Sequence, residues 1–423
     1  MNKKDRHITV FEHQRLRYDV GEKRISKDIY ETLVSFYGNG SPYFDLIHNG
    51  VKFNEYVGVL QVNGILIEVL PKADKNPDTE AEEKRWRAVL IDMMRTVGGF
   101  NIQAPSTAHL KIRPNTILDL YFGLFIEEVE YLLHTGLVKQ YRKTEGNATA
   151  LKGSLQFPRH IQQNLVHPER FYVRHTVYDA EHRLHFILYK TLRLLYRINT
   201  NASLHSRIGA LLLNFPEMPD IRVTEALFEK LKFNRKTLRY KKAIEIAKML
   251  LLNYHPDVAK GRHDVLALMF DMNLLWEQFI YATLRGLRTE GVSINAQFPR
   301  KFWKPDHGKS IMIRPDIWIQ KDAGNIILDT KWKNLNGNNP SADDLRQMYV
   351  YHDYFGAKKV ALVYPGEAPF ETSGAFWSPD NTHLKDKICF VVMLAVPEKA
   401  EASKTLVGQW QDDIRRKFEK WLD

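Results

Sequence analysis

Three consecutive apolar residues in the segment NIILDTKW, namely Ile326, Ile327 and Leu328, limit most strongly how this chain can fold. Side chains alternate between the two faces of a strand, so a strand that is apolar at successive positions must be covered on both faces. Such a strand belongs at the centre of a sheet. It leaves Asp329 and Lys331 at the end of a buried strand, where charge is costly. The order of the elements from about residue 262 onward predicts a mixed α/β architecture around it.

The preceding segment, KSIMIRPDIWIQ, is the expected antiparallel partner of that strand. A hairpin that turns at residues 321–324 places Asp316 directly opposite Asp329, with Cβ atoms about 5 Å apart. Two carboxylates at this separation repel each other, and one divalent cation could bind both. Alternation places Lys331 on the same face as Asp329. A surface hairpin with its charged end in solvent is the alternative, which the buried run argues against.

The length of 423 residues suggests two or three domains. Residues 1–110 are expected to form a strand-rich domain, because YVGVLQVNGILIEVLPK has two apolar runs around Asn63-Gly64, a strong hairpin signal. Helical spacing dominates the expected middle region, residues 111–261. Residues 262–423 suggest the order helix, hairpin, helix, strand, strand, helix, beginning with the expected helix VLALMFDMNLLWEQFIYATLRGL.

Bulk properties narrow the class of protein. No run of about 18 apolar residues and no apolar signal-peptide core is present, so we expect a cytoplasmic protein without a membrane partner. A single cysteine, Cys389, excludes an internal disulfide and a cysteine-based zinc site. The net charge of +11 makes a polyanionic partner such as nucleic acid plausible without identifying it.

The order Pro315-Asp316, a hairpin, and then Asp329-Thr330-Lys331 resembles the active-site motif of the PD-(D/E)xK nuclease superfamily. The motif is short and by itself matches many unrelated chains. Whether it indicates a nuclease therefore depends on the residues in the flanking helices.

Superfamily members similar to RecB-type nucleases also carry a glutamate on the preceding helix and Gln-x-x-x-Tyr on the following one. Glu277 lies in LLWEQFIY ahead of the hairpin, and Gln347 and Tyr351 lie in DDLRQMYVYHD behind it. Positions 347 and 351 share one helix face. Alone, Glu277 would be interpreted as an ordinary helix glutamate and Tyr351 as a core aromatic. The glutamate, Pro-Asp, Asp-x-Lys and Gln-x-x-x-Tyr in this order together indicate a nuclease.

The wider chain resembles the McrC family, the endonuclease subunit of McrBC restriction systems. The resemblance runs through FEHQRLRY, YFDLIHNGVKFNEYVGVLQVNGILIEVLPK, KGSLQFPRH and WEQFIY in this order. One departure is His182 in YDAEHRLHFIL, where the family has asparagine. The resemblance implies that the C-terminal part, residues 262–423, is a PD-(D/E)xK endonuclease domain and that residues 1–110 bind a partner motor.

The resemblance also implies Mg²⁺-dependent hydrolysis of DNA, with Mn²⁺ as a substitute. The expected catalytic residues are Asp316, Asp329, Lys331, Glu277, Gln347 and Tyr351. Asp316, Asp329 and the main-chain carbonyl of Thr330 would bind the metal, with Glu277 as a further ligand or as the residue that orients a metal-bound water. Lys331 would position the attacking water and stabilise developing negative charge. Gln347 and Tyr351 would hold the scissile phosphate or the outer shell of the metal.

The implied partners are double-stranded DNA and a McrB-like AAA+ GTPase hexamer that translocates it. This chain has no P-loop, since Gly308-Lys309-Ser310 follows Trp303 where the motif requires glycine, so we expect the nucleotide to bind another chain. Two other functions remain open: a non-catalytic adaptor that activates a GTPase, and a RecB-like DNA-repair nuclease that acts alone. The sequence does not indicate which DNA modification is targeted or the oligomeric state.

Two further clusters receive less weight. Glu181, His182 and His185 lack another ligand at suitable spacing for a metal site. The basic run at 230–242 either follows a DNA backbone or is a solvated helix face.

Overall fold

The computed structural model describes residues 7–21, 23–38, 40–72, 79–97, 116–255, 264–322, 324–333, 335, 339–401 and 404–422. The chain divides into two compact units. The larger unit combines Met1–Lys111 with Pro256–Asp423, and the smaller one is Ile112–His255. The predicted separation of residues 1–110 from residues 262–423 as two domains stays a prediction.

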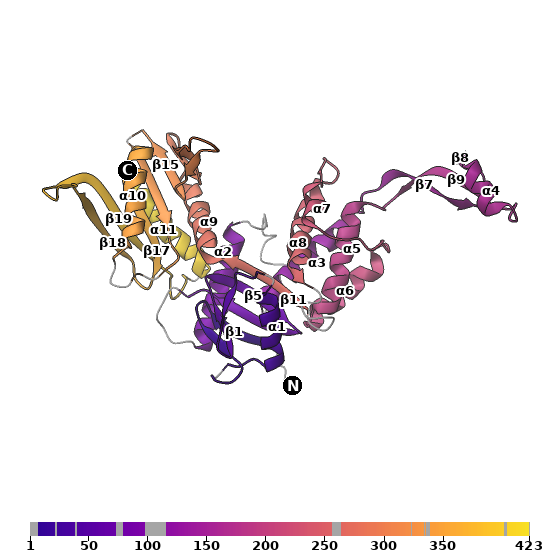
Figure 1. Cartoon of the computed structure of the whole chain (residues 1–423), viewed down its shortest axis with the longest axis horizontal. Coiled ribbons are helices and arrows are strands. Elements are labelled where there is room, and N and C mark those ends of the chain that lie inside the picture. The colour runs from indigo at the N-terminus through magenta and orange to yellow at the C-terminus, as the bar shows by residue number, and fades with distance from the viewer. Residues whose placement is uncertain are drawn as a thin grey trace. The chain divides into compact units, whose positions relative to one another are not determined.

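The first sheet of the larger unit contains strands in the order β1, β6, β5, β11 (Figure 1). Their bounds are β1 His7–Phe11, β5 Tyr56–Val62, β6 Ile65–Leu70 and β11 Val265–Asp271. The predicted hairpin is confirmed, because β5 and β6 are antiparallel and Asn63 and Gly64 have φ values of 49° and 77°, as a type I′ turn requires. A second, smaller sheet and two helices accompany it: β2 Arg15–Arg17, β3 Phe44–Ile47, β4 Gly50–Phe53, α1 Lys27–Tyr37 and α2 Glu80–Val97.

Strand β11 corrects the sequence analysis, which expected one continuous helix from residue 265 onward. Val265–Asp271 is a strand that pairs antiparallel with β5, and helix α9 begins only at Met272 and runs to Leu284. The first four residues of β11 are at most 2% exposed, so this apolar run is covered on both faces. Asp271 then starts the helix, because its carboxylate accepts hydrogen bonds from the N–H groups of Asn273 and Leu274.

The second sheet contains the apolar strand that bears Asp329. Its order is β12, β15, β16, β17, β19, β18, with bounds β12 Val292–Ala296, β15 Ile317–Lys321, β16 Asn325–Thr330, β17 Ala357–Gly366, β18 Phe370–Trp377 and β19 Leu384–Ala395. Strand β16 lies in the interior of the sheet, antiparallel to β15 and parallel to β17. The prediction of a buried central strand and of a mixed α/β fold is confirmed.

Three helices pack around this sheet: α9, α10 Ala342–Phe355 and α11 Leu406–Leu422. Ile327 lies in a buried cluster with Met348 and Phe355 of α10, so alternation directs Ile326 and Leu328 to the opposite face of the sheet. Trp276 of α9 donates to the main-chain carbonyl of Val363 on β17 at 3.3 Å. The helices therefore fix the ends of the central strands.

The predicted strand KSIMIRPDIWIQ is wrong in one respect, because it is two strands. β14, Ile311–Ile313, pairs with β13, Arg300–Trp303, in a separate sheet, and β15 begins only at Ile317. Pro315 has no N–H to donate to a ladder and restricts the backbone of Arg314, which interrupts the strand. A short 3₁₀ turn, η3 Arg285–Leu287, follows α9.

The smaller unit is mainly helical, as predicted. Its elements are α3 Ile117–His134, α5 Arg183–Ile198, α6 Ala202–Asn214, α7 Glu225–Glu229, the 3₁₀ turn η2 Leu238–Tyr240, α8 Lys241–Leu252 and β10 Tyr254–His255. None of the described helices of the chain is long and apolar enough to span a lipid bilayer.

An antiparallel β-arm, which the sequence analysis missed, extends from the helices of this unit (Figure 1). The arm consists of β7 Gln140–Ala148 and β9 Phe171–Asp179, with β8 Ser154–Leu155 and α4 Phe157–Asn164 between them. Helix α4 begins at Phe157 and carries Pro158 in its first turn, where a missing N–H costs nothing.

Candidate functional site

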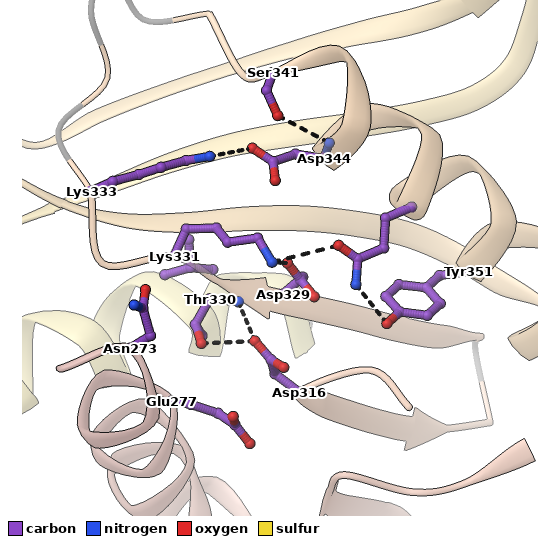
Figure 2. Close-up of polar contacts among 12 residues, drawn as sticks. Asn273, Glu277, Asp316, Asp329, Thr330, Lys331, Lys333, Ser341, Asp344 and Tyr351 are labelled. Atoms are coloured by element: carbon purple, nitrogen blue, oxygen red, sulfur yellow. Dashed lines mark hydrogen bonds and ion pairs between the residues drawn. The ribbon is translucent and has the colours of Figure 1, made fainter. Parts of the chain in front are cut away.

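The candidate site lies where β15 begins and β16 ends (Figure 2). Ile317 pairs with Leu328, and the same register one step further places Asp316 opposite Asp329, so the predicted register is confirmed. Asp316 Oδ2 accepts hydrogen bonds from the N–H of Thr330 at 2.7 Å and from its hydroxyl at 2.9 Å. Asp329 is only 1% exposed.

Lys331 connects this strand end to helix α10 (Figure 2). Its Nζ lies 2.6 Å from Asp329 Oδ2 and 3.5 Å from Gln347 Oε1. Gln347 Nε2 donates to the hydroxyl of Tyr351 at 2.9 Å, which donates to the carbonyl of Arg314 at 2.8 Å. The structure thus brings the predicted Gln-x-x-x-Tyr pair to Lys331, and the pair shares one helix face as expected.

Glu277 reaches the site from helix α9 through a residue that the sequence analysis missed. Gln297, just after β12, donates from Nε2 to Glu277 Oε1 at 2.7 Å and to Asp316 Oδ1 at 3.4 Å. A single side chain, that of Gln297, therefore bridges Glu277 and Asp316. The sequence alone does not predict that these two residues lie so close together. No local pattern points to Gln297, because its role depends on the turn after β12.

The loop after β16 is held by several elements. The main-chain N–H of Lys331 donates to the carbonyl of Val363, and that of Trp332 donates to Asn273 Oδ1 at 3.2 Å. Asn273 stands four residues before Glu277, so helical spacing could have identified it. The indole N–H of Trp332 donates to Glu12 Oε1 at 2.7 Å, which ties the residue beside Lys331 to the end of β1.

The charges of the site do not balance. Burial and then the charge of Asp316 raise the pKa of Glu277 to about 7. Burial also raises the pKa of Asp316, and burial followed by the charge of Asp316 raises that of Asp329. Burial lowers the pKa of Lys331, but the charges of Asp329 and Asp316 outweigh it and the net shift is upward. Three carboxyl groups thus surround one ammonium group, which favours an additional cation.

The donor atoms fit a hard divalent cation. Within the described residues, Asp329 Oδ1 is buried without a hydrogen-bond donor. Carboxylate and carbonyl oxygens are the ligands that Mg²⁺ prefers, and Mg²⁺ usually keeps several waters beside one or two carboxylates. In the same described ranges, no three Asp, Glu, His or Cys side chains converge closely enough to hold a metal alone. Water, phosphate oxygens or the carbonyl of Thr330 would have to complete the shell.

The less favoured clusters have partners in the protein. His182 Nδ1 accepts from the N–H of Leu184 and caps α5, His185 contacts the hydroxyl of Tyr240, and Glu181 forms an ion pair with Arg142. His182 therefore supplies the N-cap of α5.

The basic run at 230–242 begins directly after α7 and extends over a loop, η2 and the start of α8. It is therefore not one helix face. Lys242 forms an ion pair with Glu128 at 2.5 Å, and the role of the run in DNA binding stays a prediction.

Comparison with known proteins gives consistent matches. A family model described as McrBC 5-methylcytosine restriction system component matches residues 51–365. A chain of the refined half-complex from the tetradecameric assembly of Thermococcus gammatolerans McrB AAA+ hexamers with bound McrC aligns with a TM-score of 0.70 at 21% identity, covering 98% of this chain and 100% of that one. A chain of the cryo-EM structure of the T. gammatolerans McrBC complex aligns with a TM-score of 0.50 at 23% identity, covering 67% of this chain and 88% of that one. No curated protein sequence matches. At these identities the solved structures establish the fold alone.

Proposed function

Because this chain belongs to the family of McrBC 5-methylcytosine restriction system components, we propose that it is the DNA endonuclease subunit of such a system. The observation that carries the proposal is the opposed pair Asp316 and Asp329 at the ends of two buried strands, with Lys331 2.6 Å from Asp329. An adaptor without catalysis would have no use for this incompletely compensated buried charge. The PD-(D/E)xK assignment of residues 262–423 is part of the proposal.

In the proposed reaction, Asp316, Asp329 and the carbonyl of Thr330 would hold Mg²⁺, with Glu277 as a further ligand or an anchor for its water. The metal ion supplies a bound water of lowered pKa and neutralises charge on the phosphate. Lys331 Nζ orients the attacking water and donates to the oxygen on which negative charge develops.

Helix α10 limits the freedom of that lysine. Gln347 accepts from Lys331 Nζ and is itself held by Tyr351, whose hydroxyl is committed to the carbonyl of Arg314. The same chain of hydrogen bonds would receive the scissile phosphate through the amide of Gln347.

We also propose a McrB-like AAA+ GTPase hexamer as the partner. The solved assembly with similar fold contains McrC bound to McrB AAA+ hexamers. Since this sequence has no P-loop, nucleotide hydrolysis would come from the partner, and double-stranded DNA would be the shared substrate.

Substitution of Asp329→Ala or Lys331→Ala tests the proposal. Cleavage of DNA would be measured with the cognate motor, GTP and Mg²⁺, together with GTP hydrolysis by the motor. We expect Asp329→Ala to abolish cleavage and Lys331→Ala to slow it by about 10²–10³-fold, with GTP hydrolysis still stimulated.

Asp353→Ala is the matched control, since Asp353 lies on α10 in an exposed ion pair with Lys387, and it should cleave normally. Unchanged cutting by both site variants would contradict the assignment. Cutting by the unmodified protein without GTP would instead support a nuclease that acts alone.

A further inference from the structure

Gln297 has a backbone conformation that few residues adopt. Its φ is +50°, in the left-handed region that disfavours residues with a Cβ. Its N–H donates to the main-chain carbonyl of Asp316 at 3.0 Å, which extends the β12–β15 ladder by one residue beyond Ala296 and Ile317. Strained conformations of this kind persist where the surrounding structure fixes them, and they are common at functional sites.

The side chain of Gln297 uses both hydrogens of its amide on acidic residues. Nε2 is 2.7 Å from Glu277 Oε1 and 3.4 Å from Asp316 Oδ1. The group is therefore a donor placed between two carboxyl groups that belong to different elements, α9 and the start of β15. Gln297 is itself exposed to solvent.

A cation bound by Glu277 Oε1 and Asp316 Oδ1 needs the same two oxygens that now accept from Gln297. Mg²⁺ would have to approach them to about 2.1 Å, which is closer than the amide nitrogen lies. The amide group and a cation held by these two oxygens therefore exclude each other. The released side chain could turn its carbonyl oxygen toward the cation, since an amide carries both a donor and an acceptor end.

We propose that Gln297 is the gate of the cation site, a positioning residue whose amide occupies the place between Glu277 and Asp316 until a divalent cation displaces it. Gln297 has this role only if the site binds a cation, as proposed above. The gate keeps two carboxyl groups together in the metal-free protein, and it weakens cation binding because those hydrogen bonds must break first.

The test is the affinity for Mn²⁺ of the full chain without nucleotide, measured by titration calorimetry, with the melting temperature of the metal-free protein as a second measurement. Gln297→Met keeps the length of the side chain and removes both donors. We expect it to bind Mn²⁺ about three- to tenfold more tightly and to melt at a lower temperature without metal.

Gln297→Lys should act in the opposite direction, because an ammonium group placed between the carboxylates mimics the cation. We expect Mn²⁺ binding to weaken by at least about tenfold and the metal-free protein to melt at a higher temperature. Gln297→Asn tolerates positive φ but is too short to reach Glu277, so it should bind Mn²⁺ more tightly even if the methionine variant folds poorly.

Gln320→Met is the matched control, since Gln320 lies at the other end of the β12–β15 pair and accepts from Ser293 and Asn295. It should leave Mn²⁺ binding unchanged, whatever the loss of these two hydrogen bonds does to the melting temperature. Weaker or unchanged Mn²⁺ binding by both Gln297→Met and Gln297→Asn would overturn the gate while leaving the nuclease proposal intact. If the unmodified protein binds no Mn²⁺ that Asp316→Asn removes, both proposals fail together.

Discussion

Two antiparallel strand pairs in this protein carry carboxyl groups whose pKa values are shifted in opposite directions. In the arm, Asp179 is hydrogen-bonded to Arg142, which lowers the pKa of that carboxyl group below its usual value. In the β15–β16 pair, burial raises the pKa of Asp316 and of Asp329. The ladders are alike, so the difference comes from the surroundings. Carboxyl groups at a strand end favour an additional cation only where burial removes water and nearby counter-charges are too few.

The largest effect should come from removing the buried charge. Asp329→Asn keeps the shape of the side chain and should raise the melting temperature of the metal-free protein by roughly 3–6 °C, because an incompletely compensated charge leaves the interior. The same variant should lose the stabilisation that added Mg²⁺ gives. Calorimetric melting with a chelator and with Mg²⁺ measures both. A clear drop in melting temperature would mean that Lys331 already balances Asp329.

A smaller effect concerns pH. The pKa of Glu277 is raised to about 7 in the folded protein, so the folded state binds more protons than the unfolded state between about pH 4.5 and 7. Stability of the metal-free protein should therefore fall as pH rises through this window. Between pH 5 and 8 the melting temperature should decline by a few degrees, and Glu277→Gln should reduce this decline. An equal decline in that variant would mean that another group causes the pH dependence.

The smallest effect is expected in the arm. Arg142 pairs with Asp179 and Glu181 at positions where the side chains are about one-third exposed, and exposed ion pairs contribute little to stability. Arg142→Ala should shift the melting temperature by less than about 1 °C, and salt should remove most of that shift. If Arg142→Ala lowers the melting temperature by as much as Asp329→Asn raises it, exposure alone does not explain the difference between the two strand pairs.

The parts of the site that were predictable from sequence depend on local spacing. The register of Asp316 against Asp329 follows from the loop between two apolar runs, and the shared face of Gln347 and Tyr351 follows from the helical repeat. The placement of Glu277 beside Asp316 could not be predicted, because it depends on how α9 packs against the sheet. Gln297 was missed for the same reason.

The fold shows a similar division. Strand β11 was taken for a helix because a continuous apolar run satisfies either periodicity, and only its pairing with β5 decides between them. The arm was missed because QYRKTEGNA, the sequence of β7, carries polar residues on both faces and lacks the alternation of a half-buried strand. Pairing between distant segments carries the information that local patterns lack.

The junction between β11 and α9 also restricts how a gene for this protein could be divided or recombined. Asp271 ends the strand and Met272 begins the helix that bears Glu277, with no residue between them to serve as a joint. A fragment that starts at residue 272 would take the strand away from β5 and leave apolar faces of the first sheet uncovered. If recombination between two genes joined them ahead of residue 265, strand β11 of one relative would have to pair with β5 of the other. The two sheets should therefore be inherited together, and exchange of the candidate nuclease part between relatives should be rare unless the first sheet travels with it.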